Sequence, residues 1–426
     1  MREKFSPSLF QKAGGFQGQS PWRSPTNINL FYSTKEPTMN ITENARLYAS
    51  LPLLSDEPRR AVIDLAALRH NYRTLRARAG GADCICVVKA DAYGHGAAAV
   101  VRALLAEGCR FFAVSCLEEA LSLRAVTAEA DILVLGAVNR VHIPLLAKHQ
   151  ITATVYSEES AAELADEAAR LDTTLRVHIK LDTGMNRLGF PANESAREET
   201  LAALTRVLSK RQLAVTGIYT HFARADEEDK TPTELQTARF LAITEALEKK
   251  GFALGTKHIC NSAGTLRFAE KYGENAVRLG IALYGYLPDT TEADLRPVMR
   301  LESKIRHIHT LPEGECVGYG GTYAPDGERR IATVGIGYAD GFLRAYTGAT
   351  VTVHTIEGDF RARVVGRVCM DMCMLDVTDI PAARGDRVTL FGLAPCELEA
   401  LSARADTIPY ESLCSVSARV PRVYEE

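Results

Sequence analysis

The chain lacks three features that would each indicate a particular class of protein. No window reaches about 18 consecutive apolar residues, which argues against a membrane-spanning helix. Lysine and arginine number 50 against 53 acidic residues, so the net charge of −3 leaves no basic excess for nucleic-acid phosphates. The ten cysteines contain no CxxC pair, and Cys84 and Cys86 stand in an apolar run that is typical of buried thiols. We therefore expect a cytoplasmic protein with no membrane, nucleic-acid or metal partner.

The first 58 residues differ in composition from the rest of the chain. They mix Ser, Pro, Gly, Gln and Asn with isolated aromatic residues and show neither helical nor strand periodicity. They also lack the apolar core of a secretory signal, and Glu3 and Glu36 interrupt what could otherwise be a transit peptide. We expect residues 1–58 to form a disordered extension, and the folded part to begin near Arg59.

Short β-rich runs alternate with helical patterns over residues 59–296. Stretches between the runs, such as AAAVVRALLAEG, place apolar residues at i, i+3, i+4 and i+7. Eight strands separated by helices predict an α/β fold of the (β/α)8 TIM-like barrel type, with an open doubly wound sheet as the alternative. The eight runs are CICVVKA (84–90), FFAVS (111–115), ILVLG (132–136), TATVY (152–156), LRVHIK (175–180), VTGIYT (215–220), KHICN (257–261) and NAVRLG (275–280).

Residues 297–426 have a different character. Strand-like segments such as RRIATVGIGY and ATVTVHTIEG are separated by Gly and Pro, and only ELEALSARAD near 397 looks helical. The pattern predicts a mainly β C-terminal domain after the barrel.

A lysine closes the first predicted barrel strand, where barrel enzymes carry their chemistry. Lys89 follows two valines and precedes Tyr93 and a Gly-His-Gly turn. Beside the apolar barrel interior, the pKa of a lysine can fall enough for its amine to form a Schiff base. For a single lysine at a strand end, a solvated loop charge is the alternative.

Charged side chains also end the fifth predicted strand. Alternation places Lys180 and Asp182 on one face, and Arg187 follows in a glycine-bounded turn. Arginine is a natural bidentate partner for a carboxylate or a phenolate, although an ordinary salt bridge would explain it equally well.

Small polar residues and glycine follow the seventh and eighth predicted strands, in Asn261-Ser262-Ala263-Gly264 and Arg278-Leu279-Gly280-Ile281. This is where barrels of this type recurrently bind phosphate, although a Ser-Ala-Gly turn is also a routine helix N-cap. A phosphate site opposite a Schiff-base lysine is what pyridoxal phosphate requires.

Eight motifs in this order strengthen that interpretation: VVKADAYGHG, KLDTGMNRLGF, YTHFA, CNSAG, RLGIALYG, VGYGGTY, GYADGFLR and VCMDM. From about residue 59 to 426 the chain resembles the alanine racemases, fold-type III pyridoxal-phosphate enzymes with a barrel followed by a β domain. The resemblance implies an isomerase that interconverts L-alanine and D-alanine with pyridoxal 5'-phosphate, by proton transfer between two bases. It also implies a role in supplying D-alanine for the peptidoglycan of the cell wall.

The resemblance implies roles for individual residues. Lys89 would hold the cofactor covalently and act as one catalytic base, and Tyr319 would be the other. His221 would link Arg278, at the pyridine nitrogen, to Tyr319. The residues implied to bind the cofactor are Lys89, Tyr93, Arg187, His221, Asn261, Ser262, Arg278, Gly280, Ile281 and Tyr410.

The remaining implied roles concern the substrate and the assembly. Arg187 and Met370 would bind the substrate carboxylate, and Tyr338 and Arg344 would line the entrance. Lys180 matches the position that is carbamylated in many members, where it orients the arginine. The family forms homodimers in which the β domain of one subunit closes the barrel mouth of the other.

The chain departs from the common family pattern at two positions. Leu279 replaces a proline, which leaves the backbone donors in place, and Asn186 replaces a glycine. If the backbone φ at Asn186 is positive, asparagine tolerates it better than most residues.

Three other functions fit parts of the pattern. Racemisation of serine or of a broader set of amino acids uses the same scaffold. Decarboxylases of this type place an acidic residue at the pyridine nitrogen, where this chain has Arg278. Non-catalytic pyridoxal-phosphate carriers lack the β domain that supplies Tyr319.

Overall fold

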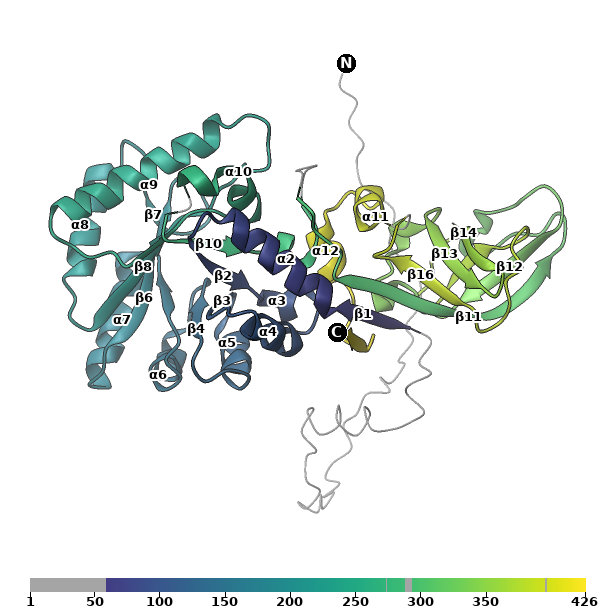
Figure 1. The fold of residues 1–426 in the computed structure, drawn as a ribbon, viewed down its shortest axis with the longest axis horizontal. Coiled ribbons are helices and arrows are strands. Elements are labelled where there is room, and N and C mark those ends of the chain that lie inside the picture. The colour runs from purple at the N-terminus through teal and green to yellow at the C-terminus, as the bar shows by residue number, and fades with distance from the viewer. Residues whose placement is uncertain (1–58, 273, 288–292, 395–396) are drawn as a thin grey trace, which may run out of the picture. The chain divides into compact units, whose positions relative to one another are not determined.

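A parallel barrel and a mostly antiparallel second sheet make up the part of the chain that a computed structural model describes, residues 59–272, 274–287, 293–394 and 397–426 (Figure 1). The disordered extension expected over residues 1–58 lies outside the described residues. Among the described helices, none has the length and apolar character that crossing a membrane requires.

The barrel contains the eight strands expected from the sequence. Neighbouring strands pair in parallel in the order β4-β3-β2-β10-β9-β8-β6-β5. An isolated parallel bridge between Leu133 and Thr152 brings the start of β5 beside β4 and nearly closes the ring. The barrel prediction is therefore confirmed, and the open doubly wound sheet is wrong. The strands are β2 (Asp83–Val87), β3 (Phe111–Val114), β4 (Asp131–Val134), β5 (Ala153–Val155), β6 (Leu175–Asp182), β8 (Leu213–Tyr219), β9 (Thr256–His258) and β10 (Ala276–Leu279).

Helices alternate with the barrel strands along the chain. Each helix has an apolar face, which is buried against the rest of the barrel. In α7 that face is Ala161, Leu164, Ala165 and Ala168, with the spacing expected for a helix. Ser157 and Ser160 form a capping box that begins α7. The helices are α2 (Leu65–Arg78), α4 (Ala97–Ala106), α5 (Leu117–Arg124), α6 (Ile143–Lys148), α7 (Glu158–Arg170), α8 (Arg197–Leu208), α9 (Thr231–Lys249) and α10 (Ser262–Tyr272).

The second sheet has the strand order β12-β15-β14-β13-β16-β11-β1-β17, and β12 also pairs with β11. The pairing of β12 with β11 joins the end of the sheet back to its middle. The length of β11 allows this, because β16 and β1 pair with its first half and β12 pairs with its second half. The mainly β character is thus confirmed. The strands are β1 (Arg60–Asp64), β11 (Met299–Leu311), β12 (Arg329–Val334), β13 (Thr350–Thr355), β14 (Gly358–Val365), β15 (Cys373–Asp376), β16 (Arg387–Phe391) and β17 (Arg422–Glu425).

Two features of this sheet differ from the expectation. Besides α11 (Leu398–Arg404), which was predicted, the short helix α12 (Pro409–Cys414) forms, begun by a proline in its first turn. Strand β1 falls within the range predicted for the barrel but pairs with β11 and β17, burying Ala61, Val62 and Ile63. A run of five residues with an apolar centre does not reveal its partner strand, and the boundaries between the parts of the chain stay a prediction.

Candidate active site

A cavity of about 600 Å³ lies at the carboxyl ends of the barrel strands. Residues within three positions after the ends of β2, β3, β4, β8, β9 and β10 all contribute to its wall, as the barrel rule predicts. The residues expected from the sequence that line it are Lys89, Tyr93, Lys180, Arg187, His221, Asn261, Ser262, Arg278, Gly280, Ile281 and Tyr410.

The cavity is electropositive. Four cationic side chains line it, those of Lys89, Lys180, Arg187 and Arg278, and no aspartate or glutamate of the described chain is among the lining residues. Burial, and then the charge of Arg187, lowers the pKa of Lys89 below its ordinary value. Burial, and then the charge of Arg278, lowers that of Lys180 to about 7. The site therefore suits an anionic ligand, and the lowered pKa of the two amines favours their nucleophilic form relative to an exposed lysine.

Lys89 begins an unusual left-handed turn, α3 (Lys89–Tyr93). Its next four residues, 90–93, all have φ between 52° and 55°. Left-handed backbone costs an L-residue roughly 1–2 kcal/mol, so the neighbouring structure must hold the turn in place. Glu119 accepts from Ala90 N at 2.6 Å, and Asp91 accepts from Ala97 N at 2.7 Å.

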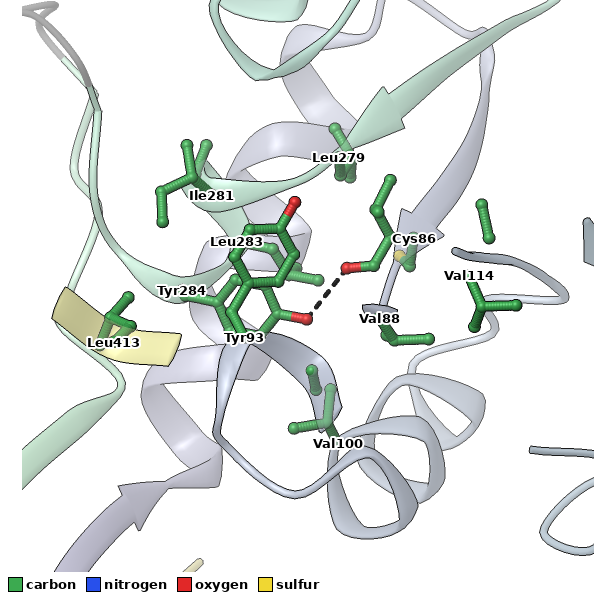
Figure 2. Packing of buried hydrophobic residues seen from close by; sticks show 14 of the residues in the cluster. Cys86, Val88, Tyr93, Val100, Val114, Leu279, Ile281, Leu283, Tyr284 and Leu413 are labelled. Atoms are coloured by element: carbon green, nitrogen blue, oxygen red, sulfur yellow. Dashed lines mark hydrogen bonds between the residues drawn. The ribbon is translucent and has the colours of Figure 1, made fainter. Parts of the chain in front are cut away.

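The left-handed turn directs Tyr93 into the core, where only 6% of it is exposed. Figure 2 shows Tyr93 beside Tyr284, with the ring centroids 4.8 Å apart. The dashed line there is the hydrogen bond of 3.0 Å that the Tyr284 hydroxyl donates to the Val87 carbonyl oxygen. Tyr410, from α12, lies 6.1 Å from Tyr93 between ring centroids. Aromatic packing thus holds the Tyr93 hydroxyl at the cavity wall.

The loops after β9 and β10 form a concave, polar surface. Ser262 Oγ accepts from the backbone N–H of Gly280 at 3.0 Å and of Ala282 at 3.3 Å. Asn261 Oδ1 accepts from Gly264 N at 2.9 Å, as a helix N-cap does, at the start of α10. A Cβ at Gly280 would lie 3.1 Å from Tyr93 Oη, so the glycine keeps this concavity open. Hydroxyls and N–H groups at a helix N-terminus suit a phosphate.

Arg278 is 4% exposed, and its guanidinium is held almost entirely by neutral acceptors. Nη1 donates to the Nδ1 and the carbonyl oxygen of His258, at 2.9 and 2.6 Å. Nη2 donates to the carbonyl oxygens of Thr220 and Ile259, at 2.7 and 3.0 Å, with a longer contact of 3.4 Å to His221 Nδ1. Among the described residues Nε–H has no partner. It is therefore the donor left for a ligand.

The turn that carries Arg187 is organised by Asp182. The Asp182 carboxylate accepts from the backbone N–H of Gly184, Asn186 and Arg187, at 3.0, 3.0 and 3.1 Å. Asp182 itself is not among the cavity-lining residues, and Arg187 forms no ion pair within the described chain. The φ of Asn186 is +55°. Asparagine thus stands in place of the family's glycine at a position where the backbone is left-handed.

Four of the expected residues do not line this cavity: Tyr319, Tyr338, Arg344 and Met370. Tyr319 is 71% exposed and Met370 53%. Tyr338 and Met370 lie close together in segments that connect strands of the second sheet, because the backbone N–H of Tyr338 and Ala339 donate to the carbonyl oxygens of residues 369 and 370. Of the implied link from Arg278 through His221 to Tyr319, only the contact between Arg278 and His221 forms within this chain.

Several residues of the cavity wall were not predicted from the sequence, and Tyr219 is one of them. Its ring stacks on His258 with centroids 4.7 Å apart, and its hydroxyl lies 3.0 Å from Thr154 Oγ1. Lys180 Nζ and the guanidinium carbon of Arg278 are each 5.4 Å from the ring centroid, within cation–π range. Its position at the end of a strand was the available signal. The other missed residues are Val87, Ser115, Leu135, Gly136 and Leu188.

Two family models match this chain. The model of the alanine racemase N-terminal domain matches residues 63–288, and that of the alanine racemase C-terminal domain matches residues 298–424. Together they cover most of the described residues.

Individual relatives agree with the family models. A protein named alanine racemase from Desulfovibrio desulfuricans is 39% identical over 376 residues, which cover 87% of this chain and 99% of the relative. The alanine racemase of Desulforamulus reducens is 40% identical over 374 residues, covering 86% and 99%.

Solved structures are similar over the same range. Alanine racemase from Clostridium difficile 630 superimposes with a TM-score of 0.80 at 37% identity, covering 87% of this chain and 96% of that one. The enzyme from Streptomyces lavendulae gives 0.81 at 32% identity, covering 87% and 97%.

Proposed function

This chain belongs to the alanine racemase family, and from that premise we propose that it interconverts L-alanine and D-alanine with pyridoxal 5'-phosphate. The observation that carries the proposal is the cavity itself. Lys89, whose amine has a lowered pKa, lines this cavity together with the cationic side chains of Arg187 and Arg278. The concave surface around Gly280 lines the same cavity. A phosphorylated ligand with a reactive aldehyde matches all of these features.

The residues present fit that cofactor. Tyr93, Ser262 and Tyr410 would hold the phosphate through their hydroxyls, and Gly280 and Ile281 would hold it through backbone N–H groups. Asn261 belongs to the same loop as Ser262. The unpartnered Nε–H of Arg278 would donate to the pyridine nitrogen. Lys89 would bind the aldehyde carbon covalently. When bound, the cofactor supplies a conjugated system that makes the Cα–H of an amino acid acidic enough to be removed.

The chain's own residues then move the proton. Once the substrate amino group has taken its place on the aldehyde carbon, Lys89 would again be a free amine. Its Nζ would act on one face of the substrate Cα and Tyr319 Oη on the other, so that removal of the proton on one face and its return on the opposite face inverts the configuration. Arg187 and the Met370 backbone bind the substrate carboxylate and orient Cα between the two bases. Arg278 cannot give up its proton readily, so it orients the ring without protonating it.

Tyr319 and Met370 would come from a second copy of this chain. Both are exposed, and both lie outside the cavity formed by a single chain. A homodimer in which the second sheet of one subunit covers the barrel mouth of the other would bring them to Lys89 and exclude water. Tyr338 and Arg344 would then line the entrance.

Two finer assignments follow from the same proposal. Lys180 would be the carbamylated position, since a pKa of about 7 leaves much of its amine in the neutral form that reacts with CO2. The D-alanine formed would supply peptidoglycan synthesis.

Replacing Lys89 tests the proposal. We expect Lys89→Ala to lose covalent attachment of pyridoxal phosphate and all racemisation of L-alanine. Borohydride reduction of the wild-type enzyme followed by peptide mapping should label Lys89. The control is Lys180→Ala, which should keep the label at Lys89; a label on Lys180 in the wild type would contradict the assignment. Assays with L-serine beside L-alanine distinguish a broader racemase.

A further inference from the structure

Three buried side chains inside the barrel form a continuous hydrogen-bonded chain that runs away from the candidate active site. Arg278 Nη1 lies 2.9 Å from His258 Nδ1, and His258 Nε2 lies 2.9 Å from His178 Nδ1. The three residues come from β10, β9 and β6, and their exposed fractions are 4%, 0% and 2%. The proposed reaction uses the arginine at one end and assigns nothing to the two histidines.

The chemistry of the three groups fixes the direction of these hydrogen bonds. A guanidinium can only donate, so His258 Nδ1 must accept, and its ring proton must be on Nε2. That proton is donated to His178 Nδ1, which leaves the proton of His178 on its own Nε2. Burial, followed by the charge of Arg278, holds the pKa of His258 well below its ordinary value. Burial also lowers the pKa of His178 to about 3, so both rings are neutral at neutral pH.

The surrounding residues fix both rings. A Cβ at Gly217 would lie 2.5 Å from the His178 ring, so the glycine makes the space that this ring occupies. The edge of His178 meets Phe111, with centroids 5.7 Å apart, and Tyr219 stacks on His258 with an angle of 7° between the planes. A pair of aliphatic side chains would fill a barrel interior without burying polar atoms, so packing alone does not account for this pair.

We propose that His178 is a positioning residue for Arg278. By accepting the Nε2–H of His258, it holds His258 in the tautomer whose Nδ1 accepts from Arg278, and thereby keeps the guanidinium oriented with its Nε–H toward the cavity. If His258 carried its proton on Nδ1, Arg278 would face a donor and lose one of its acceptors. The effect on catalysis rests on the proposed function, because the ligand of Nε–H is the proposed cofactor.

His178, the last residue in this series of hydrogen bonds, borders a cavity at the opposite end of the barrel. His178 lines this cavity, of about 550 Å³, together with Cys109, Asp131 and Arg176. Its Nε2 has no hydrogen-bond partner among the described residues, so solvent in this cavity can accept its proton. His178 can therefore keep its own proton on Nε2 while its Nδ1 accepts from His258, and no protein group beyond His178 is needed to complete the series of hydrogen bonds.

Two substitutions of His178 distinguish positioning from packing. His178→Asn keeps an acceptor where Nδ1 lies but removes volume, whereas His178→Leu keeps most of the volume and removes the acceptor. We expect the Leu variant to lose at least about tenfold in kcat with little change in KM, and the Asn variant to remain within about threefold of wild type. Packing alone would predict the reverse order, and an activity of the Leu variant equal to or above that of the Asn variant would overturn the proposal.

Nuclear magnetic resonance of the histidine rings gives a readout that does not depend on activity. In wild-type protein with pyridoxal phosphate bound and 15N in its histidines, we expect His258 to be neutral, with its proton on Nε2, and that ring N–H signal to be lost in the Leu variant. A proton on Nδ1 of His258, or on both nitrogens, overturns the proposal even if the Leu variant does not fold. If the wild-type protein racemises no alanine, the proposed function fails while this measurement still tests the tautomer.

Discussion

Asn186 has a left-handed backbone next to the arginine proposed to hold substrate. Its φ is +55°, and its N–H and that of Arg187 both bind the Asp182 carboxylate. Glycine and asparagine adopt this conformation readily, whereas a residue with a Cβ and no local hydrogen-bonding group does not. The identity of residue 186 therefore affects both the stability of the turn and the placement of Arg187.

We expect Asn186→Ala to lower the free energy of unfolding by about 1 kcal/mol and to raise KM for alanine, because alanine disfavours positive φ. The matched control is Asn186→Gly, which should change the stability by only a few tenths of a kcal/mol. Urea unfolding and steady-state kinetics measure both effects. Equal losses in the two variants would mean that the asparagine side chain, rather than φ, is what the turn needs.

At the scale of elements, the left-handed turn α3 determines where Lys89 stands. Four consecutive residues with positive φ are unfavourable by themselves, so hydrogen bonds from outside the turn must support them. Asp91 supplies one by accepting from the first backbone N–H of α4 at 2.7 Å. Glu119 supplies another and also accepts from Ser115 N at 2.8 Å, which joins the ends of β2 and β3.

Asp91→Ala should lower the free energy of unfolding by about 1 kcal/mol or more, since it removes the acceptor for an N–H at the start of a helix and puts alanine at positive φ. Asp91→Asn keeps the acceptor and a tolerated φ, so it should lie close to wild type. Denaturant unfolding of the three proteins tests this. Similar stability of the Ala and Asn variants would show that Asp91 does not support the turn.

At the scale of the whole molecule, the barrel cavity of one chain lacks Tyr319, the residue proposed as the second base. Lys89 lines the cavity, while Tyr319 is exposed in the connection between β11 and β12 of the second sheet. An isologous dimer would supply Tyr319 to each of two equivalent sites.

Mixing Lys89→Ala with Tyr319→Phe protein under conditions of subunit exchange should restore activity. Each mixed dimer would contain one intact site and one site with both substitutions. Random exchange makes about half of the dimers mixed, so roughly a quarter of the wild-type activity should return. The separate mutants, treated in the same way, are the control. If activity stays at their level after exchange is demonstrated, both bases come from one chain.

The sequence by itself determined the barrel, because eight strands separated by helices leave few arrangements that bury every apolar face. It also indicated the residues at the strand ends that gather around the cavity, since the carboxyl ends of parallel strands meet at one edge. The resemblance implied which residues would be the two bases and which cofactor would bind. The strand and helix periodicity and the motifs at the strand ends are patterns of neighbouring residues, which can be recognised in the sequence alone.

Only the tertiary structure decided how those residues are supported. The pairing of β1 with β11 and β17, the stacking of Tyr219 on His258, and the chain from Arg278 to His178 join segments far apart in the sequence. The left-handed backbone after Lys89 could not be predicted from Ala-Asp-Ala-Tyr, because alanine and tyrosine ordinarily avoid positive φ. Long-range hydrogen bonds and packing outweigh local preference at such positions, and they form only when the whole chain has folded.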